Sequence, residues 1–370
     1  MKKYTASTLD PLYFRRTELA QRLLFSLKDG ITHALTLFAP RRMGKTQFLL
    51  NDVRPLAEEM GFHVFYFSFM DQSSGNISAL FAESLMQFLD SITHGKNKLL
   101  DKLKELKQID VLGVGIELNQ AQAEHRTITI NNILQAIAEK SEKPVLMLLD
   151  EVQELARENK QNGLVRSLRT GLDANQSKIK VIFTGSSTNG LRAMFNDNKA
   201  PFFHFAHALD FPVLTKDFTD FLADIYHDRT GKEIDKTAFY HIFERFHFTP
   251  LYLRSIAQDM IINPDLTLEQ ATNYRFSQIT EQGETADKWQ KLSLLEQELL
   301  KLLVQGETAL YTKESRERLE EILGIETISA STIQGKIKKL ERNELITRQA
   351  NGNLKINNPY FETWIAENKL

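Results

Sequence analysis

The sequence predicts an α/β protein with a five-stranded parallel sheet, followed by a helical part and a small C-terminal domain. Three observations lead to this prediction. Apolar, strand-like runs alternate with amphipathic, helix-like runs as far as Pro212. The strand-like runs are apolar on both faces, as in a parallel sheet that helices cover on both sides. After Pro212 the pattern becomes all-helical, and the 370 residues are enough for about two to three domains.

The predicted elements of the first part follow one another in a regular order. A helix is expected over 14–30, before the sheet begins. The expected strands are 34–39, 63–71, 143–155, 179–187 and 204–214. The expected helices between them are 46–60, 76–92, 128–141 and 162–176. The polar residues 93–126 are interpreted as a surface excursion from this core.

The rest of the chain changes character twice. Residues 215–290 show helical spacing throughout, whereas a third pattern begins at 292. There, three helix-like runs precede two short strand-like runs around Asn351-Gly352, and this order is typical of a winged-helix module. The predicted boundaries are 1–30 for an N-terminal helical segment, 31–212 for the sheet domain, 213–290 for a helical lid and 291–370 for the winged-helix domain.

The composition excludes several kinds of chemistry. The chain has no cysteine, which excludes disulfides, thiol catalysis and thiolate metal sites, and its nine histidines show no metal-ligand spacing. A net charge of -2 argues against a surface-wide coat for nucleic acid, although a local basic patch remains compatible with it. No apolar signal region or membrane-spanning run is found, so we expect a cytoplasmic protein.

A loop between the first strand and the next helix carries a phosphate-binding pattern. Residues 39–46 read A-P-R-R-M-G-K-T, with Ala39 where the pattern G-x-x-x-x-G-K-[ST] begins with glycine. Gly44 permits close approach of the backbone, Lys45 can reach the β- and γ-phosphates, and the Thr46 hydroxyl can hold Mg²⁺. The alternative is a glycine turn before a basic helix. The predicted nucleotide-binding residues of this loop are Ala39, Pro40, Arg41, Arg42, Met43, Gly44, Lys45, Thr46 and Gln47, and Lys45 is also predicted to be catalytic.

Two acids follow the most apolar strand. Asp150 and Glu151 come directly after V-L-M-L-L, at the carboxyl end of the strand, where α/β sheets bind ligands. Asp150 is predicted to hold Mg²⁺ through water, and Glu151 is predicted to polarise a water molecule aimed at the γ-phosphorus. The two acids could instead only stabilise a helix start.

Short hydroxyl side chains end the next strand. Thr184, Ser186 and Ser187 follow V-I-F, and this strand is expected beside the strand of the phosphate loop. Thr184 and Ser186 are therefore predicted to act in catalysis by contacting the γ-phosphate or the attacking water. The alternative is a simple turn at the strand end.

With these motifs in order, the chain resembles the additional-strand P-loop ATPases of the AAA+/STAND division, and in particular the archaeal-type ATPases. The resemblance is carried by Phe14, Arg15, Arg16, Glu18, Leu19, residues 40–46, residues 150–155 and residues 184–187. It covers nearly the whole chain and implies ATP binding, ATP hydrolysis, a helical lid and a winged helix.

The resemblance also implies residues around the base. It suggests that Phe14 and Arg15 lie near the adenine and that Pro250 packs against the base. Phe248 stands where the family has glycine, a residue that permits close backbone approach. Arg254 could reach a phosphate or could be a solvated lid arginine. Candidates for an arginine acting on a neighbouring subunit are Arg166, Arg169 and Arg192.

The nucleotide is expected to drive a switch. In the first hypothesis ATP orders the lid and so controls binding to a macromolecular partner, which could be duplex DNA. The predicted DNA-binding residues are Lys336, Lys339, Arg342 and Arg348. The winged helix could instead serve only for packing or protein docking. In the second hypothesis the chain is a self-associating signalling or anti-phage defence ATPase that acts on protein partners without DNA. A small-molecule kinase is less favoured, because no segment resembles an acceptor pocket.

Overall fold

The computed structural model divides the chain into two compact units. One unit is Arg15–Pro212, and the other is Val213–Leu370 together with Met1–Phe14. The structure describes residues 10–70, 77–93, 129–156, 162–186, 194–195, 200, 202–280, 284–307, 309–348 and 352–370. Ser187 and Arg192 lie outside these residues. The predicted surface excursion over 93–126 also lies outside them, apart from its first residue.

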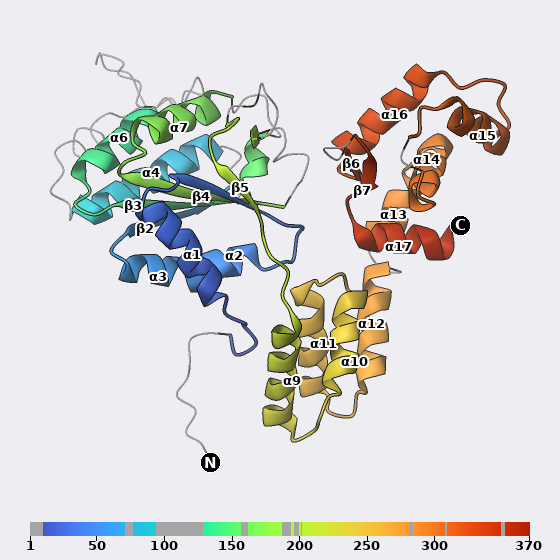
Figure 1. Ribbon diagram of the computed structural model, residues 1–370, viewed down its shortest axis with the longest axis horizontal. Helices are drawn as coiled ribbons and strands as arrows, with labels where there is room; N and C mark the ends of the chain where they lie inside the picture. Colours follow the sequence, from blue (N-terminus) through green and yellow to red (C-terminus); the bar gives the residue numbers. More distant parts are fainter. Residues whose placement is uncertain are drawn as a thin grey trace, which may run out of the picture. The chain divides into compact units, whose positions relative to one another are not determined.

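The first unit contains the predicted five-stranded parallel sheet (Figure 1). Its strands are β1 (Ala34–Phe38), β2 (His63–Ser68), β3 (Val145–Asp150), β4 (Ile179–Gly185) and β5 (His207–Asp210). They lie in the order β2-β3-β4-β1-β5, and each neighbouring pair is parallel. The prediction of the fold class is therefore confirmed, including the position of β4 beside the strand that precedes the phosphate loop.

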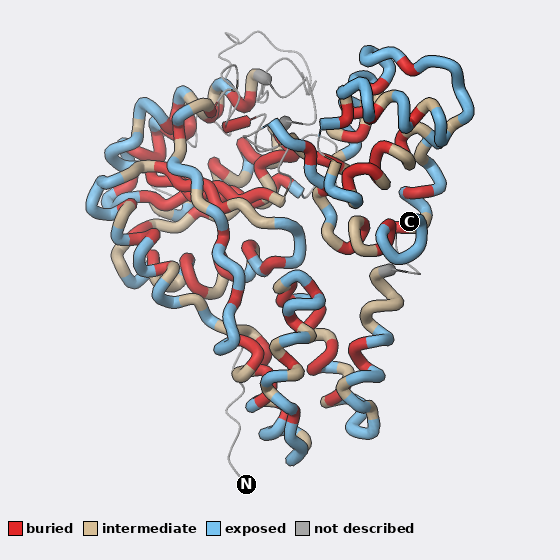
Figure 2. The backbone as a smooth tube through the Cα atoms, turned by 45° about the vertical axis from the view of Figure 1, so that its right-hand side comes forward, coloured by how far each residue is buried: buried red, intermediate tan, exposed pale blue. Residues whose placement is uncertain are grey.

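Burial explains why the sequence identified the central strands and overextended the edge strand. Every residue of β3 and β4 is buried, and most of them are apolar, so both strands are covered on both faces (Figure 2). The prediction of a strand over 204–214 was wrong in its extent, because β5 has only four residues. Residues 202–205 form turns instead, and His204 has a left-handed backbone with φ 55°.

Helices cover both faces of the sheet (Figure 1). One face packs against α1 (Thr17–Lys28), α2 (Lys45–Phe48), a π-helical turn (Leu49–Val53) and α3 (Arg54–Glu59). The other face packs against α4 (Ile77–Thr93), α6 (Ile130–Lys140) and α7 (Asn162–Ala174). Two separate hydrophobic clusters result, one on each side of the sheet.

The π-helical turn interrupts the helix predicted over 46–60. Pro55 lies in the first turn of α3 and has no backbone N–H to donate to the carbonyl four residues earlier. That carbonyl belongs to Asn51, and it accepts a hydrogen bond of 3.2 Å from the Arg15 guanidinium instead. The proline therefore explains the widened helix at this point.

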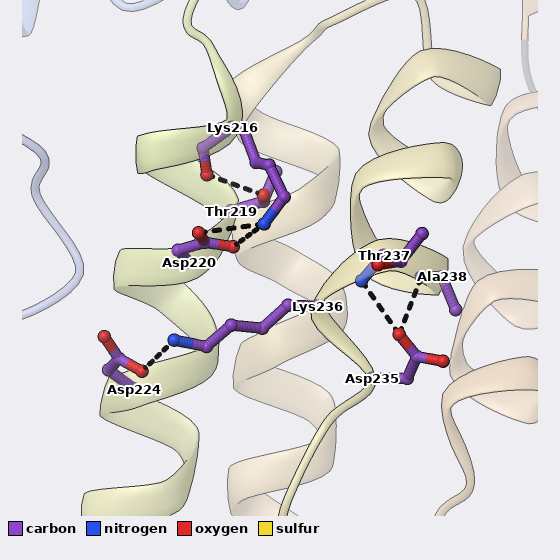
Figure 3. Close-up of polar contacts among 8 residues, drawn as sticks. All are labelled: Lys216, Thr219, Asp220, Asp224, Asp235, Lys236, Thr237 and Ala238. Carbon is purple, nitrogen blue, oxygen red and sulfur yellow. Dashed lines mark hydrogen bonds and ion pairs between the residues drawn. The ribbon is translucent and has the colours of Figure 1, made fainter.

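The second unit begins with four helices around one hydrophobic cluster. They are α9 (Lys216–Thr230), α10 (Lys236–Arg245), α11 (Pro250–Ile262) and α12 (Leu268–Thr280). Asp235 caps α10 by accepting hydrogen bonds from the backbone N–H groups of Thr237 and Ala238 (Figure 3). The Lys236 ammonium lies 2.6 Å from Asp224 and joins α10 to α9.

The C-terminal residues build a further hydrophobic cluster. Its elements are α13 (Glu284–Gln290), α14 (Leu294–Val304), α15 (Lys313–Leu323), α16 (Ala330–Arg342), β6 (Ile346–Arg348), β7 (Leu354–Ile356) and α17 (Pro359–Asn368). β6 and β7 are antiparallel, as the sequence predicted. The sequence analysis did not predict α17, in which the Tyr360 hydroxyl donates to the Phe246 carbonyl and lies 3.1 Å from the Thr249 hydroxyl. Among the helices that the structure describes, none has the length and apolar character needed to cross a membrane.

Candidate active site

The phosphate loop joins β1 to α2 through a left-handed glycine. Gly44 has φ 86° and ψ 19°, a conformation that costs glycine little because it has no Cβ. Nothing lies within 4 Å of the point where a Cβ would stand, so the backbone angle rather than lack of space requires glycine. Met43 is buried and anchors the loop in the core, whereas Pro40, Arg41, Arg42, Gly44 and Gln47 are exposed.

Lys45 is buried beneath this loop and spans it. Its ammonium donates hydrogen bonds to the carbonyl oxygens of Ala39 at 2.8 Å and Pro40 at 2.9 Å. Burial lowers the pKa of Lys45, while the negative charges of Glu151 and Asp150 act in the opposite direction. The ammonium therefore lies in the field of both acids, although it bonds to neutral oxygens.

The carboxylate of Asp150 is 1% exposed and accepts four hydrogen bonds. One oxygen accepts from the Thr46 hydroxyl at 2.6 Å and from the Tyr66 hydroxyl at 3.3 Å. The other accepts from the Thr184 hydroxyl and from the backbone N–H of Glu151 at 3.1 Å. Burial and the Asp150 charge raise the pKa of Tyr66 to about 12, so this tyrosine remains a neutral donor.

Glu151 is the next residue and has an unusual backbone. Its φ of 54° lies in the left-handed region, which costs a non-glycine residue about 1–2 kcal/mol. Its carboxylate accepts a hydrogen bond of 2.7 Å from the Ser186 hydroxyl and another from the Gln153 amide. The hydroxyls that end β4 thus lie on the two acids, with Thr184 on Asp150 and Ser186 on Glu151.

Arg16 ties the loop to two other segments, a role that the sequence analysis did not assign. Its guanidinium donates to the carbonyls of Met43 and Pro212 and lies 4.1 Å from the centre of the Phe211 ring. Its backbone N–H donates to the buried Asp52 carboxylate at 3.1 Å. The signal in the sequence was the motif from Phe14 to Leu19, which contains both Arg15 and Arg16.

Two further residues were missed. Tyr66 lies in β2 beside the strand of the acids, and its polar tip in an otherwise apolar strand was the available signal. Gln153 follows Glu151 by two residues and contacts both Glu151 and Ser186. Because a side chain two residues away can point in many directions, spacing alone did not identify this contact.

The residues that the resemblance places near the adenine base belong to two different units: Phe14 and Pro250 to one, and Arg15 to the other. Phe14 packs edge-on against Phe218 and Phe221 of α9, with ring centroids 5.9 Å and 5.4 Å away. Arg15 belongs to the first unit and donates to the Asn51 carbonyl at 3.2 Å.

Pro250 is buried in the first turn of α11. Phe248, which replaces the glycine of the family pattern, has φ 53°, so the left-handed turn forms here with a bulky residue. Arg254 pairs with Asp10 of the N-terminal segment within the second unit. The structure therefore describes Arg254 as an ion-paired residue and not as a solvated arginine.

The predicted DNA-binding residues mostly interact with other residues of the C-terminal hydrophobic cluster and its surroundings. The ammonium groups of Lys336 and Lys339 lie 3.3 Å and 2.8 Å from Glu296 of α14. Burial acts to raise the pKa of the Glu296 carboxyl, but hydrogen bonds from Lys339, Ser293 and Lys336 lower it to about 2. These lysines thus neutralise a fully buried carboxylate.

The other two candidates differ from each other. Arg348 donates to the Tyr311 hydroxyl at 2.7 Å and to the Gly352 carbonyl at 3.1 Å, and it lies 3.5 Å from Glu341. Arg342 is exposed at the end of α16. Of the four predicted DNA-binding residues, only Arg342 is exposed.

The fold and the site define a P-loop ATPase. β4 separates the strand of the loop from the strand of the acids, and the loop lysine, its threonine and both acids gather at one edge of the sheet. The chain belongs to the ATPase family described as the ATPase domain predominantly from Archaea, which matches residues 13–244. It is accordingly an ATPase of this family.

Solved structures share the fold at low sequence identity. The Walker-type ATPase of Pyrococcus abyssi is 17% identical with a TM-score of 0.62, over 96% of each chain. The ADP form of the Aeropyrum pernix ORC2 protein is 16% identical with a TM-score of 0.53, over 99% of this chain and 95% of that one. No curated protein matches the chain.

Proposed function

We propose that this ATPase is a nucleotide-driven switch whose bound state controls attachment to a macromolecular partner. The observation that carries the proposal is the hydrogen bond of 2.6 Å between Thr46 and Asp150, beside the buried Lys45. It joins the helix after the loop to the strand that bears the acids. This is the arrangement that a site for a metal–triphosphate requires.

The donor set beside the loop suits Mg²⁺. Proteins hold this ion with one or two carboxylates together with substrate phosphates and water. Asp150 and Thr46 supply a carboxylate and a hydroxyl within hydrogen-bond distance of each other. In the proposal these two residues hold the ion, while Lys45 and the loop amides hold the triphosphate. Bound Mg²⁺ would neutralise charge on the β- and γ-phosphates.

Glu151 is the residue that we assign to the attacking water. Asp150 accepts hydrogen bonds at both oxygens, whereas the described residues donate to only one oxygen of Glu151. A carboxylate with an oxygen open to water can orient the water and accept its proton as it attacks the γ-phosphorus. The products are ADP and phosphate.

The connections between the two units support the switch. The chain passes from one unit to the other at Phe14–Arg15 and again at Pro212–Val213. Arg16 donates to the carbonyls of both Pro212 and Met43, so it links the connection at Pro212–Val213 to the phosphate loop. It also directly follows the connection at Phe14–Arg15 in the chain. We infer that a change in the loop on hydrolysis reaches these connections through Arg16.

The C-terminal domain is the part that we assign to the partner. We interpret α14, α15, α16 and the β6–β7 hairpin as a winged helix, with α16 as its recognition helix. Lys338 and Arg342 lie on the exposed side of α16, and Gln334 and the helical Gly335 lie there as well. Glycine inside a helix costs about 1 kcal/mol relative to alanine. A close approach by a partner would account for it, and the two cations favour the phosphates of duplex DNA.

A second candidate is a self-associating ATPase that acts on protein partners. It is favoured by the engagement of Lys336, Lys339 and Arg348 within the domain, which leaves few cations for phosphates. Good DNA binders neutralise several phosphates at once.

The catalytic assignment is tested with Glu151→Gln. We expect this variant to bind ATP with unchanged affinity and to hydrolyse it about 10²- to 10⁴-fold more slowly, the usual contribution of a general base. Glu58→Gln, an exposed glutamate on α3, is the matched control and should hydrolyse normally. Normal turnover in Glu151→Gln would remove Glu151 from this role.

The partner is tested by sizing the chain with and without a non-hydrolysable ATP analogue and duplex DNA. If DNA is the partner, Lys338→Glu with Arg342→Glu should abolish a salt-dependent association, whereas Lys313→Glu on α15 should not. Lys336 and Lys339 are unsuitable for this test, because their loss exposes the buried Glu296 charge. Self-association on nucleotide without DNA binding would support the second candidate.

A further inference from the structure

The described residues hold the carboxylate of Glu151 at one of its two oxygens. Its Oε2 accepts hydrogen bonds from the Ser186 hydroxyl at 2.7 Å and from the Gln153 side-chain amide. Among the residues that the structure describes, none donates to Oε1. The carboxylate is therefore fixed on one side and open on the other.

The Gln153 amide can take only one orientation. Its Oε1 accepts a hydrogen bond of 3.3 Å from the backbone N–H of Ser186, a group that can only donate. Its Nε2 must therefore face the carboxylate of Glu151. The side chain is 1% exposed, so surrounding groups rather than water satisfy it. Gln153 thus connects the end of β4 to Glu151.

The backbone of Glu151 needs such support. Left-handed backbone at a non-glycine residue persists only where neighbouring contacts determine it. Here the Glu151 carbonyl accepts from the Glu154 N–H at 3.1 Å, and the side chain is held by Gln153 and Ser186. Loss of the Gln153 donor leaves one hydroxyl to hold the carboxylate.

We propose that Gln153 is a positioning residue for ATP hydrolysis, which holds Oε2 of Glu151 so that Oε1 faces the attacking water. The proposal rests on the role assigned to Glu151 above. Among the residues that the structure describes, Gln153 hydrogen-bonds to residues 151, 154 and 186 and not to the phosphate loop or Lys45. It should therefore affect the rate of hydrolysis and leave ATP affinity unchanged.

The first test is Gln153→Met, which keeps the length of the side chain and removes the donor. We expect kcat to fall about 10- to 100-fold, because misplacing a catalytic group by about 1 Å costs up to about 10²-fold. The Kd for ATP, measured by calorimetry without turnover, should change less than about twofold. An unchanged kcat, or equal losses of affinity and rate, would overturn the proposal.

Gln135→Met is the matched control. Gln135 is an exposed residue of α6 that donates to Glu139 at 2.9 Å, so this variant also removes an amide donor from a glutamate. We expect both its kcat and its Kd to match those of the unmodified chain. A fall equal to that of Gln153→Met would show that the effect is not specific to Glu151.

A double variant separates positioning from general structural support. If Gln153 acts only through Glu151, adding Gln153→Met to Glu151→Gln should lower kcat no further. A further loss equal to that of the single variant would overturn the proposal. If Glu151→Gln lowers kcat and Gln153→Met does not, the positioning role of Gln153 is ruled out and the role of Glu151 stands. If Glu151→Gln has normal kcat, the role of Glu151 is ruled out, and the role of Gln153 with it.

Gln153→Leu guards against a defect peculiar to the first variant. It is also uncharged and also removes the donor, without placing a second carboxylate beside Glu151. Thermal unfolding should show that at least one of the two variants is folded. We expect the same fall in kcat at unchanged Kd in each folded variant, and a folded variant with full turnover would contradict the proposal.

Discussion

Two clusters of acids and lysines in this chain are built in opposite ways. At the edge of the large sheet, Lys45 donates to neutral carbonyls, although it lies in the field of Asp150 and Glu151. In the C-terminal domain, Lys336 and Lys339 both contact the buried carboxylate of Glu296. The first cluster keeps its charges apart, and the second neutralises them.

The difference lies in what satisfies the acids. Hydroxyl and amide groups hold Asp150 and Glu151, so neither acid takes the Lys45 ammonium as its partner. In the proposed function, Lys45 then serves the triphosphate and the two acids serve the metal and the water. At Glu296 the lysines themselves fill that role. A buried ion pair of this kind fixes two elements together, whereas separated charges of opposite sign can serve catalysis.

Lys45→Ala should have the largest effect on this comparison. Removal of the ammonium takes away the buried cation that bonds to the Ala39 and Pro40 carbonyls, and we expect ATP binding or turnover to be lost. Calorimetric titration with an ATP analogue measures the loss. Lys28→Ala is the control, because the Lys28 ammonium also donates to a carbonyl, that of Met60 at 3.2 Å, and should be dispensable. Full ATP turnover in Lys45→Ala would contradict the role of this loop in binding the triphosphate.

Lys336→Ala combined with Lys339→Ala should destabilise the C-terminal domain by about 3–5 kcal/mol, because it leaves a buried charge without a partner. Both tryptophans of the chain, Trp289 and Trp364, lie in the hydrophobic cluster of that domain. Their fluorescence during urea unfolding therefore reports on this domain. Lys338→Ala should change its stability by less than about 0.5 kcal/mol. Equal stability of the double variant and this control would show that the lysines do not hold Glu296.

Glu296→Gln should change how stability depends on pH. The folded-state pKa of Glu296 is lowered from 4.5 to about 2, so its contribution is complete above 4.5 and is lost as pH falls towards 2. We expect the variant to be about 1–2 kcal/mol less stable at pH 7 and to lose less stability over this acid range. Tryptophan fluorescence during unfolding at several pH values checks this. Parallel curves for the two chains would contradict the prediction.

Tyr66→Phe should have the smallest effect. It removes one of four donors to Asp150, and the distance of 3.3 Å makes this a weak one. We expect the Mg²⁺ concentration for half-maximal hydrolysis to change a few-fold while maximal turnover is retained. Tyr274→Phe, at an exposed tyrosine of α12, should leave the Mg²⁺ dependence as it is. A loss of all turnover would show that Tyr66 has a larger role than support of Asp150.

The sequence predicted the central part of the fold because burial leaves a strong pattern. β3 and β4 are buried on both faces, and they contain the apolar runs V-L-M-L-L and V-I-F. The pattern is weak at exposed elements, and the exposed β5 was overextended for that reason. The α17 helix was missed because its length of ten residues allows few repeats of a helical pattern, and the π-helical turn depends on Pro55 meeting Arg15 from a distant segment.

At the site, the sequence predicted the functional groups but not the residues that hold them. The loop residues, Asp150 and Glu151 were predicted from motifs whose chemistry requires those residue types. The positions of Gln153, Tyr66 and Arg16 depend on which segments the fold brings together. Lys336 and Lys339 show the same limit, because a basic helix face has the same sequence pattern whether it meets DNA or a buried carboxylate.

The most direct test of the central claim is a crystal structure of the chain with Mg²⁺ and a non-hydrolysable ATP analogue. The account predicts that Lys45 bonds to the β- and γ-phosphates, that Thr46 and Asp150 lie at the metal, and that Lys336 and Lys339 stay on Glu296. A triphosphate bound away from residues 39–46, or Lys45 paired with Asp150 or Glu151 beside the bound nucleotide, would contradict it.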